Sequence, residues 1–329
     1  MQPALDRYHS IPRLDLGFYP TPIEEMPRLR AALGGGPRLW IKRDDYSGPG
    51  FGGNKIRKLE YVFAQARADG ADTVITTGGE ASNHCRVTAA VAARLGLRCI
   101  LIMNPARSPR PASLYLDELY GAEIRRVTTR GERAQALEML AEELRRQGRK
   151  VCVIPLGASM PLGSLGYVQA VEELHAQLQK LGDPPRRIYH STSSGGTQAG
   201  LDAGLQLFGM KEIRLIGVSA DDTAESLSRT VSGIVAGVAM LPGMPVNALR
   251  RPLEVEDGFA GEGYAIPTAE SEEALQLVAR TEGIVLDPVY TAKAMAALIA
   301  AVRARRIPRE DPVLFWHTGG QMGLFEHAG

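Results

Sequence analysis

The sequence predicts an α/β fold built from two open, twisted parallel sheets in two domains. Short apolar and β-branched segments alternate with helical patterns along most of the chain, which is typical of parallel sheets covered by helices on both faces. The chain has 329 residues, more than a single hydrophobic core usually supports, so two domains are expected. We expect the active site in the cleft between these domains.

The first block of alternating elements begins near residue 50. Its strands are indicated by short runs of β-branched residues, and its helices by apolar residues at helical spacing. Strands are predicted at 73–77, 99–103, 123–127 and 150–155. Helices are predicted from Asn54 onward, through Val87 to Leu95, near 112–120 and at 131–147.

A second block repeats the same alternation up to the end of the chain. Its helices are predicted at 164–179, at 194–208 after a glycine loop, at about 222–238, at 270–282 and at 290–304. Its strands are predicted at 187–191, 213–218 and 313–317. A further strand at Arg38–Lys42 precedes both blocks, and its pattern alone leaves open which domain it joins.

The composition argues against several classes of protein. The formal net charge is +1 with basic and acidic residues interspersed, so neither a nucleic acid nor a membrane is an expected partner. No apolar run approaches membrane-spanning length, and no signal peptide is evident. Three cysteines, Cys85, Cys99 and Cys152, are too few for a disulfide framework and favour a cytoplasmic location. No His-Glu-x-x-His pattern occurs, so no catalytic metal is expected.

The segment Gly52–Glu60 places Lys55 in the first turn of a helix, directly after two glycines. Glycine lets the backbone turn sharply and lets another group approach closely. The positive end of the helix dipole opposes the charge of Lys55, so its pKa is expected to be lowered. The neutral amine is the form that condenses with an aldehyde or acts as a base. A solvated lysine at a helix start is the simpler interpretation of this segment alone.

The loop Ser193–Gly200 lies between a predicted strand and a predicted helix, and its small residues expose backbone N–H groups at a helix N-terminus. Such a loop suits a phosphate group. Its spacing matches neither the Walker A pattern nor the dinucleotide fingerprint, which favours a simple phosphate monoester over ATP or NAD. An ordinary glycine turn is the alternative.

Two further junctions carry polar residues at positions where ligands bind. Ser82 is placed to cap a helix, and the same helix start could bind a substrate carboxylate. Tyr290 begins a helix after a proline-fixed turn, and Thr318 follows the last strand, where open parallel sheets contact ligands. Each feature alone is more often structural. Together with Lys55 and the glycine loop, they predict a pyridoxal phosphate site.

The chain resembles the fold-type II pyridoxal-phosphate enzymes, with the tryptophan synthase β-like architecture. Within them it is similar to the D-cysteine desulfhydrase and 1-aminocyclopropane-1-carboxylate deaminase family. The matching segments follow the family's order across nearly the whole chain, which makes the match more specific than any single motif. They are 20–22, 41–45, 52–60, 82–84, 194–200, 261–264, 287–295 and 317–320.

The resemblance implies a role for each matching residue. Lys55 matches the lysine that binds the cofactor covalently, Ser82 the serine near the substrate carboxylate, and Asn83 the asparagine beside the phenolic oxygen. Thr318 matches the residue that faces the pyridine nitrogen, and Tyr264 and Tyr290 match two active-site tyrosines. The cofactor-binding set is completed by Asn54 and by Ser194, Gly195, Gly196, Thr197 and Gly200 of the phosphate cup. The substrate-binding set is Ser82, Asn83 and His84.

The resemblance also implies a division into domains and an assembly. A larger cofactor-binding domain is expected from residues 1–50 and 160–329, and a smaller domain from residues 51–159, which carries Ser82 and Asn83. A homodimer is expected.

The implied reaction is α,β-elimination from a small amino acid, foremost D-cysteine, catalysed by a lyase. The ring-opening deaminases resemble one another in carrying Glu after the second tyrosine and Leu before the final Gly-Gly, where this chain has Thr291 and Thr318. The pair Glu80-Ala81 departs from the Ile-Gln or similar pair common in the family, and a carboxylate there would change the electrostatics near the substrate. Deamination of the cyclopropane amino acid, elimination from L-cysteate, and a binding or sensor protein without turnover stay open as alternatives.

Overall fold

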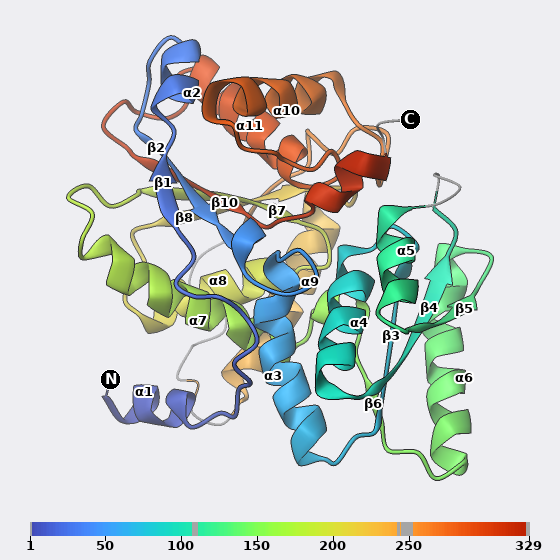
Figure 1. Ribbon diagram of the computed structural model, residues 1–329. Coiled ribbons are helices and arrows are strands. Elements are labelled where there is room, and N and C mark those ends of the chain that lie inside the picture. Colours follow the sequence, from blue (N-terminus) through green and yellow to red (C-terminus); the bar gives the residue numbers. More distant parts are fainter. Residues whose placement is uncertain (1, 107–110, 242–243, 245–252, 327–329) are drawn as a thin grey trace.

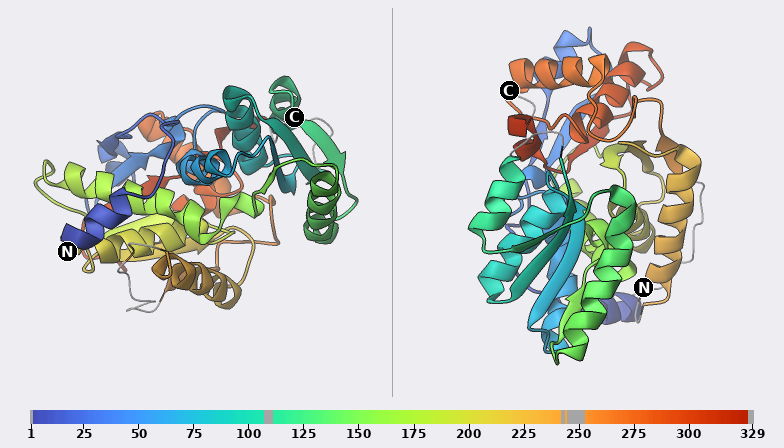
Figure 2. Two further views of the ribbon diagram at one scale, coloured as in Figure 1. Left: turned by 90° about the horizontal axis from the view of Figure 1, so that it is seen from below. Right: turned by 90° about the vertical axis from the view of Figure 1, so that its right-hand side faces the viewer.

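The computed structural model describes residues 2–106, 111–241, 244 and 253–326, and within them the chain forms two sheets flanked by helices (Figure 1). The larger sheet has the strand order β1-β2-β10-β7-β8-β9, and the smaller sheet has the order β5-β4-β3-β6. All neighbouring strands pair in parallel except β1, which is antiparallel to β2. Figure 2 shows the two sheets side by side, each with helices on both faces. The predicted α/β class with two sheets is therefore confirmed.

The smaller sheet is buried on both faces because its strands present apolar side chains in both directions. On β4, Leu101 and Met103 pack towards α3 and α4, whereas Ile100 and Ile102 pack towards α6. Its strands are β3 (Thr73–Gly79), β4 (Arg98–Asn104), β5 (Glu123–Arg126) and β6 (Val151–Val153). Its helices are α3 (Asn54–Ala68), α4 (Asn83–Leu95), α5 (Ala112–Leu119) and α6 (Arg133–Arg146).

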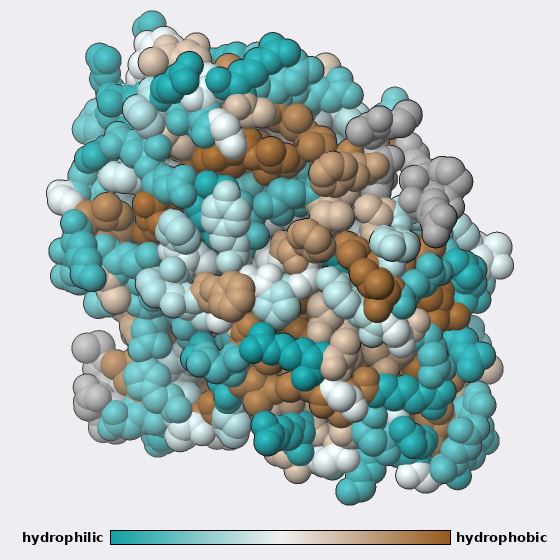
Figure 3. All heavy atoms as spheres, in the orientation of Figure 1, coloured by the Kyte–Doolittle hydropathy of each residue, from teal (hydrophilic) through white to brown (hydrophobic). Residues whose placement is uncertain are grey.

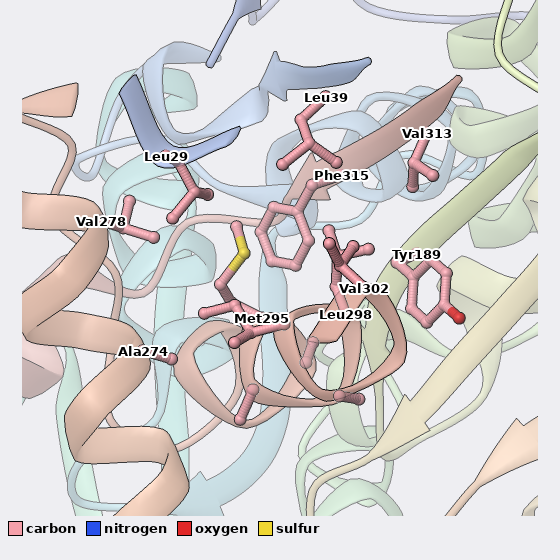
Figure 4. Packing of buried hydrophobic residues seen from close by; sticks show 14 of the residues in the cluster. Leu29, Leu39, Tyr189, Ala274, Val278, Met295, Leu298, Val302, Val313 and Phe315 are labelled. Carbon is pink, nitrogen blue, oxygen red and sulfur yellow. The ribbon is translucent and has the colours of Figure 1, made fainter. Parts of the chain in front are cut away.

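The larger sheet is also covered on both faces. One face packs on α10, α11 and α2, where Leu39, Val313 and Phe315 meet Met295 and Leu298 (Figure 4). The other face packs on α7 and α8. The strands are β1 (Ile23–Glu25), β2 (Leu39–Arg43), β7 (Arg187–Thr192), β8 (Arg214–Ser219), β9 (Glu254–Glu256) and β10 (Val313–His317). The helices are α1 (Gln2–His9), α2 (Pro27–Ala32), α7 (Pro161–Leu178), α8 (Gly196–Leu207), α9 (Ala224–Ala239), α10 (Ala269–Glu282) and α11 (Thr291–Arg303).

The predicted strands and helices all occur, with ends that differ by a few residues. Two α-helices, α1 and α2, and two strands, β1 and β9, are not predicted by the sequence. The two strands among them have three residues each, too few for an alternating pattern to show. The strand predicted at Arg38–Lys42 is β2, which lies between β1 and β10 and so joins the larger sheet. Helix α3 contacts both α4 and α7, and the domain boundaries near residues 50 and 160 stay a prediction.

A buried ionic cluster connects the helix that carries Lys55 to the larger sheet. Asp44 follows β2 and accepts hydrogen bonds from Arg57 of α3 at 2.8 and 2.9 Å, from Tyr167 of α7 at 2.8 Å, and from Trp316 of β10 at 2.8 Å. Burial alone would raise the pKa of Asp44, but the charge and hydrogen bonds of Arg57 lower it to about 2. Arg57 also pairs with Glu173 at 3.0 Å.

We expect Asp44→Asn to lower the free energy of unfolding by about 3 kcal/mol, because it leaves a buried guanidinium without its main counter-charge. The value lies at the low end for such a loss because Glu173 remains beside Arg57. Urea denaturation measures the change. The matched control is Glu225→Gln, which breaks an exposed pair with Arg229 and should change stability by less than about 0.5 kcal/mol. Equal effects of the two substitutions would contradict the role assigned to Asp44.

Candidate active site

A cavity of about 780 Å³ opens where strands of both sheets end. Its wall includes Gly79 at the end of β3, Asn104 at the end of β4, Thr192 at the end of β7, and Thr318 just after β10. The carboxyl ends of parallel strands are the usual place for a ligand in open α/β sheets. The cleft predicted between the two halves of the chain therefore exists, and it brings most of the predicted site residues together.

Lys55 enters this cavity because α3 begins directly against the end of β10. The N–H group of Asn54 donates a 2.9 Å hydrogen bond to the carbonyl oxygen of Thr318. The backbone of Gly53 lies so close to Gly319 that a Cβ atom on Gly319 would lie 2.5 Å from Gly53 Cα. Both glycines have positive φ, 96° and 84°. The close approach expected from the glycine pair is therefore made by the end of the last strand.

The amine of Lys55 is held in surroundings that favour its neutral form. The Lys55 side chain is half-buried, and the part of it that is accessible lies inside the cavity. Burial lowers the pKa of Lys55 to about 8. The sequence predicts the same direction from the helix dipole, whereas the structure assigns the shift to burial. A lysine with such a pKa exchanges protons readily near neutral pH.

The glycine loop and a second lysine form a cationic corner of the site. Gly195 has φ 80° and caps α8, so that the first N–H groups of this helix have no partner inside the helix. The Oγ atoms of Ser159 and Ser194 lie 2.7 Å apart, and Lys58 donates to Ser159 Oγ at 3.2 Å. Burial lowers the pKa of Lys58, and the charge of Lys55 lowers it further. Lys58 was not predicted as a site residue, although it lies one turn after Lys55 on α3.

The start of α4 forms another wall. Ser82 caps this helix, as predicted, by accepting a hydrogen bond from the N–H group of Cys85 at 3.3 Å. Asn83 accepts a 2.6 Å hydrogen bond from Arg86. Nε2 of His84 lies 2.8 Å from Thr76 Oγ1, and burial keeps the pKa of His84 well below its usual value.

Glu80 does not act on the cavity in the way the sequence suggested. Its carboxylate is bound by Arg126 at 2.9 Å and by the N–H group of Ala106 at 3.3 Å. Ala81 lines the cavity, whereas Glu80 is not among the lining residues. The change in electrostatics expected from this carboxylate is therefore offset by its own partners.

Tyr264 and Tyr290 form a hydrogen-bonded pair over the cavity, with ring centroids 5.9 Å apart in an edge-on arrangement. The loop that carries Tyr264 is held by Lys293 of α11. The Lys293 amine donates to the carbonyl oxygens of Ala220, Ala260 and Gly263 at 3.0, 2.6 and 3.1 Å. No sequence pattern marks Lys293 beyond its position three residues after Tyr290.

Thr318 and Thr291, the two residues expected from the resemblance to distinguish the subfamilies, lie in different surroundings. The hydroxyl group of Thr318 lines the cavity and lies 2.9 Å from that of Ser191. Thr291 is buried outside the cavity lining, and its hydroxyl donates to Asp287 Oδ1 at 2.7 Å. Only Thr318 is placed to contact a ligand.

The structure brings most of the predicted site residues to the cavity wall. These are Asn54, Lys55, Ser82, Asn83, His84, Ser194, Gly195, Thr197, Tyr264, Tyr290 and Thr318. Gly196 lies just behind the wall, where its N–H group donates to Ser159 Oγ at 3.3 Å. Gly200 was expected in the phosphate cup, but the structure places it elsewhere. It lies a turn into α8 against Ser164 and Tyr167 of α7, where a Cβ atom would clash, so it serves helix packing rather than the phosphate cup.

Unpaired polar atoms show that the cavity suits a polar ligand. Among the described residues, His84 Nδ1, Asn104 Oδ1 and Thr192 Oγ1 are buried without a hydrogen-bond partner, and all three residues line the cavity. Buried polar atoms are normally paired, so a ligand or water is expected to satisfy them. The described part of the chain holds no cluster of three or more metal-binding side chains. None of its helices is long and apolar enough to cross a membrane.

Comparison with known proteins gives the family of this chain. Residues 14–319 match the family model described as pyridoxal-phosphate dependent enzyme. The chain is 38% identical over 335 residues to a D-cysteine desulfhydrase of Klebsiella pneumoniae, covering 98% of both chains. It is 38% identical over 322 residues to that of Salmonella newport, covering 96% of both. The protein therefore belongs to the pyridoxal-phosphate dependent enzymes.

Solved structures agree with this assignment. A structure described as an ACC deaminase homologue superposes with a TM-score of 0.89 at 36% identity, covering 98% of this chain and 96% of the other. An L-serine ammonia-lyase from the fungus Rhizomucor miehei has a TM-score of 0.66 at 20% identity, covering 93% and 94%, and shares the fold. The cofactor predicted from the lysine, the glycine loop and the strand-end threonine is thus confirmed at the level of the family.

The lowered pKa of Lys55 gives a direct prediction for the cofactor-free protein. Acetylation of Lys55 by acetic anhydride should follow the neutral amine, so its rate should rise with pH and level off above about pH 8. Free Nα-acetyl-lysine, with a pKa of about 10.4, is the reference. Peptide mass spectrometry measures the extent of labelling at each pH. A profile for Lys55 that coincides with the reference would show that burial does not act on this amine.

Proposed function

We propose that this lyase catalyses α,β-elimination from a small amino acid, with D-cysteine as the best-supported substrate. The balanced reaction is D-cysteine plus water giving pyruvate, ammonia and hydrogen sulfide. The observation that carries the proposal is the lysine of lowered pKa, Lys55, in a cavity that also holds Ser82 and Thr318. Relatives at 38% identity over nearly the whole chain bear the name D-cysteine desulfhydrase.

The residues present fit pyridoxal phosphate, which would supply an electron sink for the carbanion at the substrate Cα. Lys55 would hold it covalently, and its phosphate would lie at the N-terminus of α8 beside Lys58 and Ser194. Asn83 would lie beside its phenolic oxygen. Thr318 would face its pyridine nitrogen with a neutral hydroxyl group, which leaves that nitrogen unprotonated. Such a weaker sink suits a reaction in which a good leaving group takes up the electrons.

Side chains and backbone groups of the protein would bind the substrate carboxylate and transfer the protons. The N-terminus of α4 and the hydroxyl of Ser82 would bind the substrate carboxylate, since a helix start attracts anions. Lys55, once released by the incoming amino group, would take the proton from Cα in its neutral form. Tyr264 or Tyr290 would assist proton transfer or position the leaving group. His84 lies on the same wall and would complete the substrate-binding set with Ser82 and Asn83.

Deamination of 1-aminocyclopropane-1-carboxylate is the second candidate, because the structure with a TM-score of 0.89 is described as an ACC deaminase homologue. Thr318 argues for elimination instead, since Leu occupies this position in the ring-opening enzymes that the chain resembles. Thr291 lies outside the cavity lining and carries less weight. A binding protein without turnover is the remaining alternative, and it would retain the cofactor but release no product.

Two experiments test the proposal. Reduction of the purified protein with borohydride should fix the cofactor to Lys55, as seen by peptide mass spectrometry, and a protein that takes up no cofactor would refute the class of enzyme. A substrate panel of D-cysteine, L-cysteine, β-chloro-D-alanine, L-cysteate and the cyclopropane amino acid should then be read by 2-oxoacid formation. More efficient release of 2-oxobutanoate from the cyclopropane substrate than of pyruvate from D-cysteine would overturn the assignment.

We also propose a cytoplasmic homodimer. The cysteines Cys85, Cys99 and Cys152 are all free, which fits a reducing compartment. Phe18, 66% exposed, and Phe51, 58% exposed, are large apolar side chains that a partner subunit could cover. Apolar side chains gather in the central part of the face drawn in Figure 3, with hydrophilic ones around its edges. Light scattering of the purified protein tests the dimer, and a monomeric mass would refute it.

We expect Thr318→Leu to lower kcat about ten- to a hundredfold while the cofactor stays bound. Loss of the hydroxyl removes a buried hydrogen bond worth about 1–3 kcal/mol, whereas Lys55 and the N-terminus of α8 are unchanged. Visible absorbance, melting temperature and kcat are measured on the same preparation. Thr318→Ser keeps the hydroxyl and serves as the matched control. An unchanged kcat with a lowered melting temperature would assign Thr318 a structural role only.

A further inference from the structure

Arg133 lines the cavity and pairs with no carboxylate in the described part of the chain. It begins α6, is 9% exposed, and lines the cavity together with Tyr264 and Tyr290. Its Nε atom donates to the carbonyl oxygen of Arg130 at 3.1 Å. In the described part of the chain, its two terminal nitrogens make no hydrogen bond and no carboxylate pairs with it. The neighbouring arginines differ, because Arg130 pairs with Asp221 at 2.9 Å and Arg126 pairs with Glu80.

The local structure does not compensate for this buried charge. Arg133 stands at the N-terminus of a helix, where the dipole disfavours a cation. Burial lowers the pKa of Arg133, and the positive charge of Arg130 lowers it further. Both effects therefore disfavour the charged guanidinium. A buried guanidinium is costly unless an anion pairs with it. A buried guanidinium at a cavity wall without a carboxylate beside it indicates that an anionic ligand pairs with it.

We propose that Arg133 binds the anionic β-substituent of the substrate, so that the enzyme selects amino acids carrying a negative charge at the side-chain end. This inference rests on the proposed elimination, in which the start of α4 and Ser82 bind the α-carboxylate. A thiolate, a sulfonate or a carboxylate on Cβ meets the chemistry of a guanidinium, which forms strong charge-assisted hydrogen bonds. A neutral hydroxyl, amide or halogen at the same position gains no such partner.

The same contact bears on the elimination step. When the Cα proton passes to Lys55, the Cβ–X bond breaks and its electron pair leaves with X. A sulfonate departs as sulfite, and a thiolate takes a proton from Tyr264 or Tyr290 and departs as hydrosulfide. Arg133 would then face the group on which the negative charge remains. It is a specificity-determining residue that contacts substrate, distinct from Lys55, which moves the proton.

Aspartate and asparagine give a clean test because they differ in the charge of the β-substituent and lack a good leaving group. Titration calorimetry of the cofactor-loaded enzyme with both enantiomers of each amino acid should show at least tenfold tighter binding of aspartate, corresponding to about 1.4 kcal/mol. Arg133→Met should abolish this preference without weakening asparagine. Arg133→Lys should restore part of it, because the charge returns without the two-pronged geometry.

The matched control is Arg145→Met, the same substitution at an exposed position on α6, and it should leave the preference unchanged. Equal weakening of both ligands in Arg133→Met would place Arg133 at the α-carboxylate and overturn the inference. A lowered melting temperature with an unchanged preference would make Arg133 structural and also overturn it. Turnover of β-chloro-D-alanine by the unmodified enzyme is measured separately, so that failure of the proposed elimination is distinguished from failure of this inference.

Discussion

The carboxylate of Asp44 is the interaction on which the geometry of the site depends. Its partners Arg57 and Trp316 each lie two residues from a site residue, Lys55 in one case and Thr318 in the other. Both bonds therefore fix the two chain segments that meet at the back of the cavity. The hydrogen bond from the N–H group of Asn54 to the carbonyl oxygen of Thr318 joins the same two segments directly. These contacts together fix the position of the lysine relative to the strand-end threonine.

Buried lysines and arginines differ in whether a carboxylate pairs with them. Lys42 is paired with Glu173, and Arg57 with Asp44, and neither cation lines the cavity. Lys58 and Arg133 are also buried but have no carboxylate partner in the described residues, and they lie at or beside the cavity. Two basic side chains without a carboxylate partner in the described residues thus lie at or beside the cavity of a chain whose overall net charge is only +1. The missing carboxylate partners at these two positions, rather than overall charge, suit the site to an anionic cofactor.

The sequence predicted what depends on local chain geometry and missed what depends on distant partners. The Gly-Gly pair before Lys55 and the cap at Ser82 are local signals, and both appear in the structure as expected. Gly200 was misassigned because a glycine one turn into a helix looks like part of a phosphate loop until α7 is seen packed against it. Arg133 lies in a helix whose other charges face solvent, so no local pattern distinguishes it. Arg133 can be recognised as a candidate ligand-binding residue only from the cavity, which is formed by chain segments far apart in sequence.

The protonation states of the ionisable groups at the cavity follow from how each group is buried. Burial raises the pKa of Tyr264 and, more strongly, that of Tyr290, so both phenols stay protonated near neutral pH. Burial keeps the pKa of His84 well below its usual value, so its ring is neutral. Of these groups, Lys55 alone has a pKa close to neutrality, at about 8. These directions support the proposal that Lys55 takes the proton from Cα and that Tyr264 or Tyr290 assists proton transfer or positions the leaving group. Lys293 holds the loop that carries Tyr264 through the carbonyl oxygens of Ala260 and Gly263.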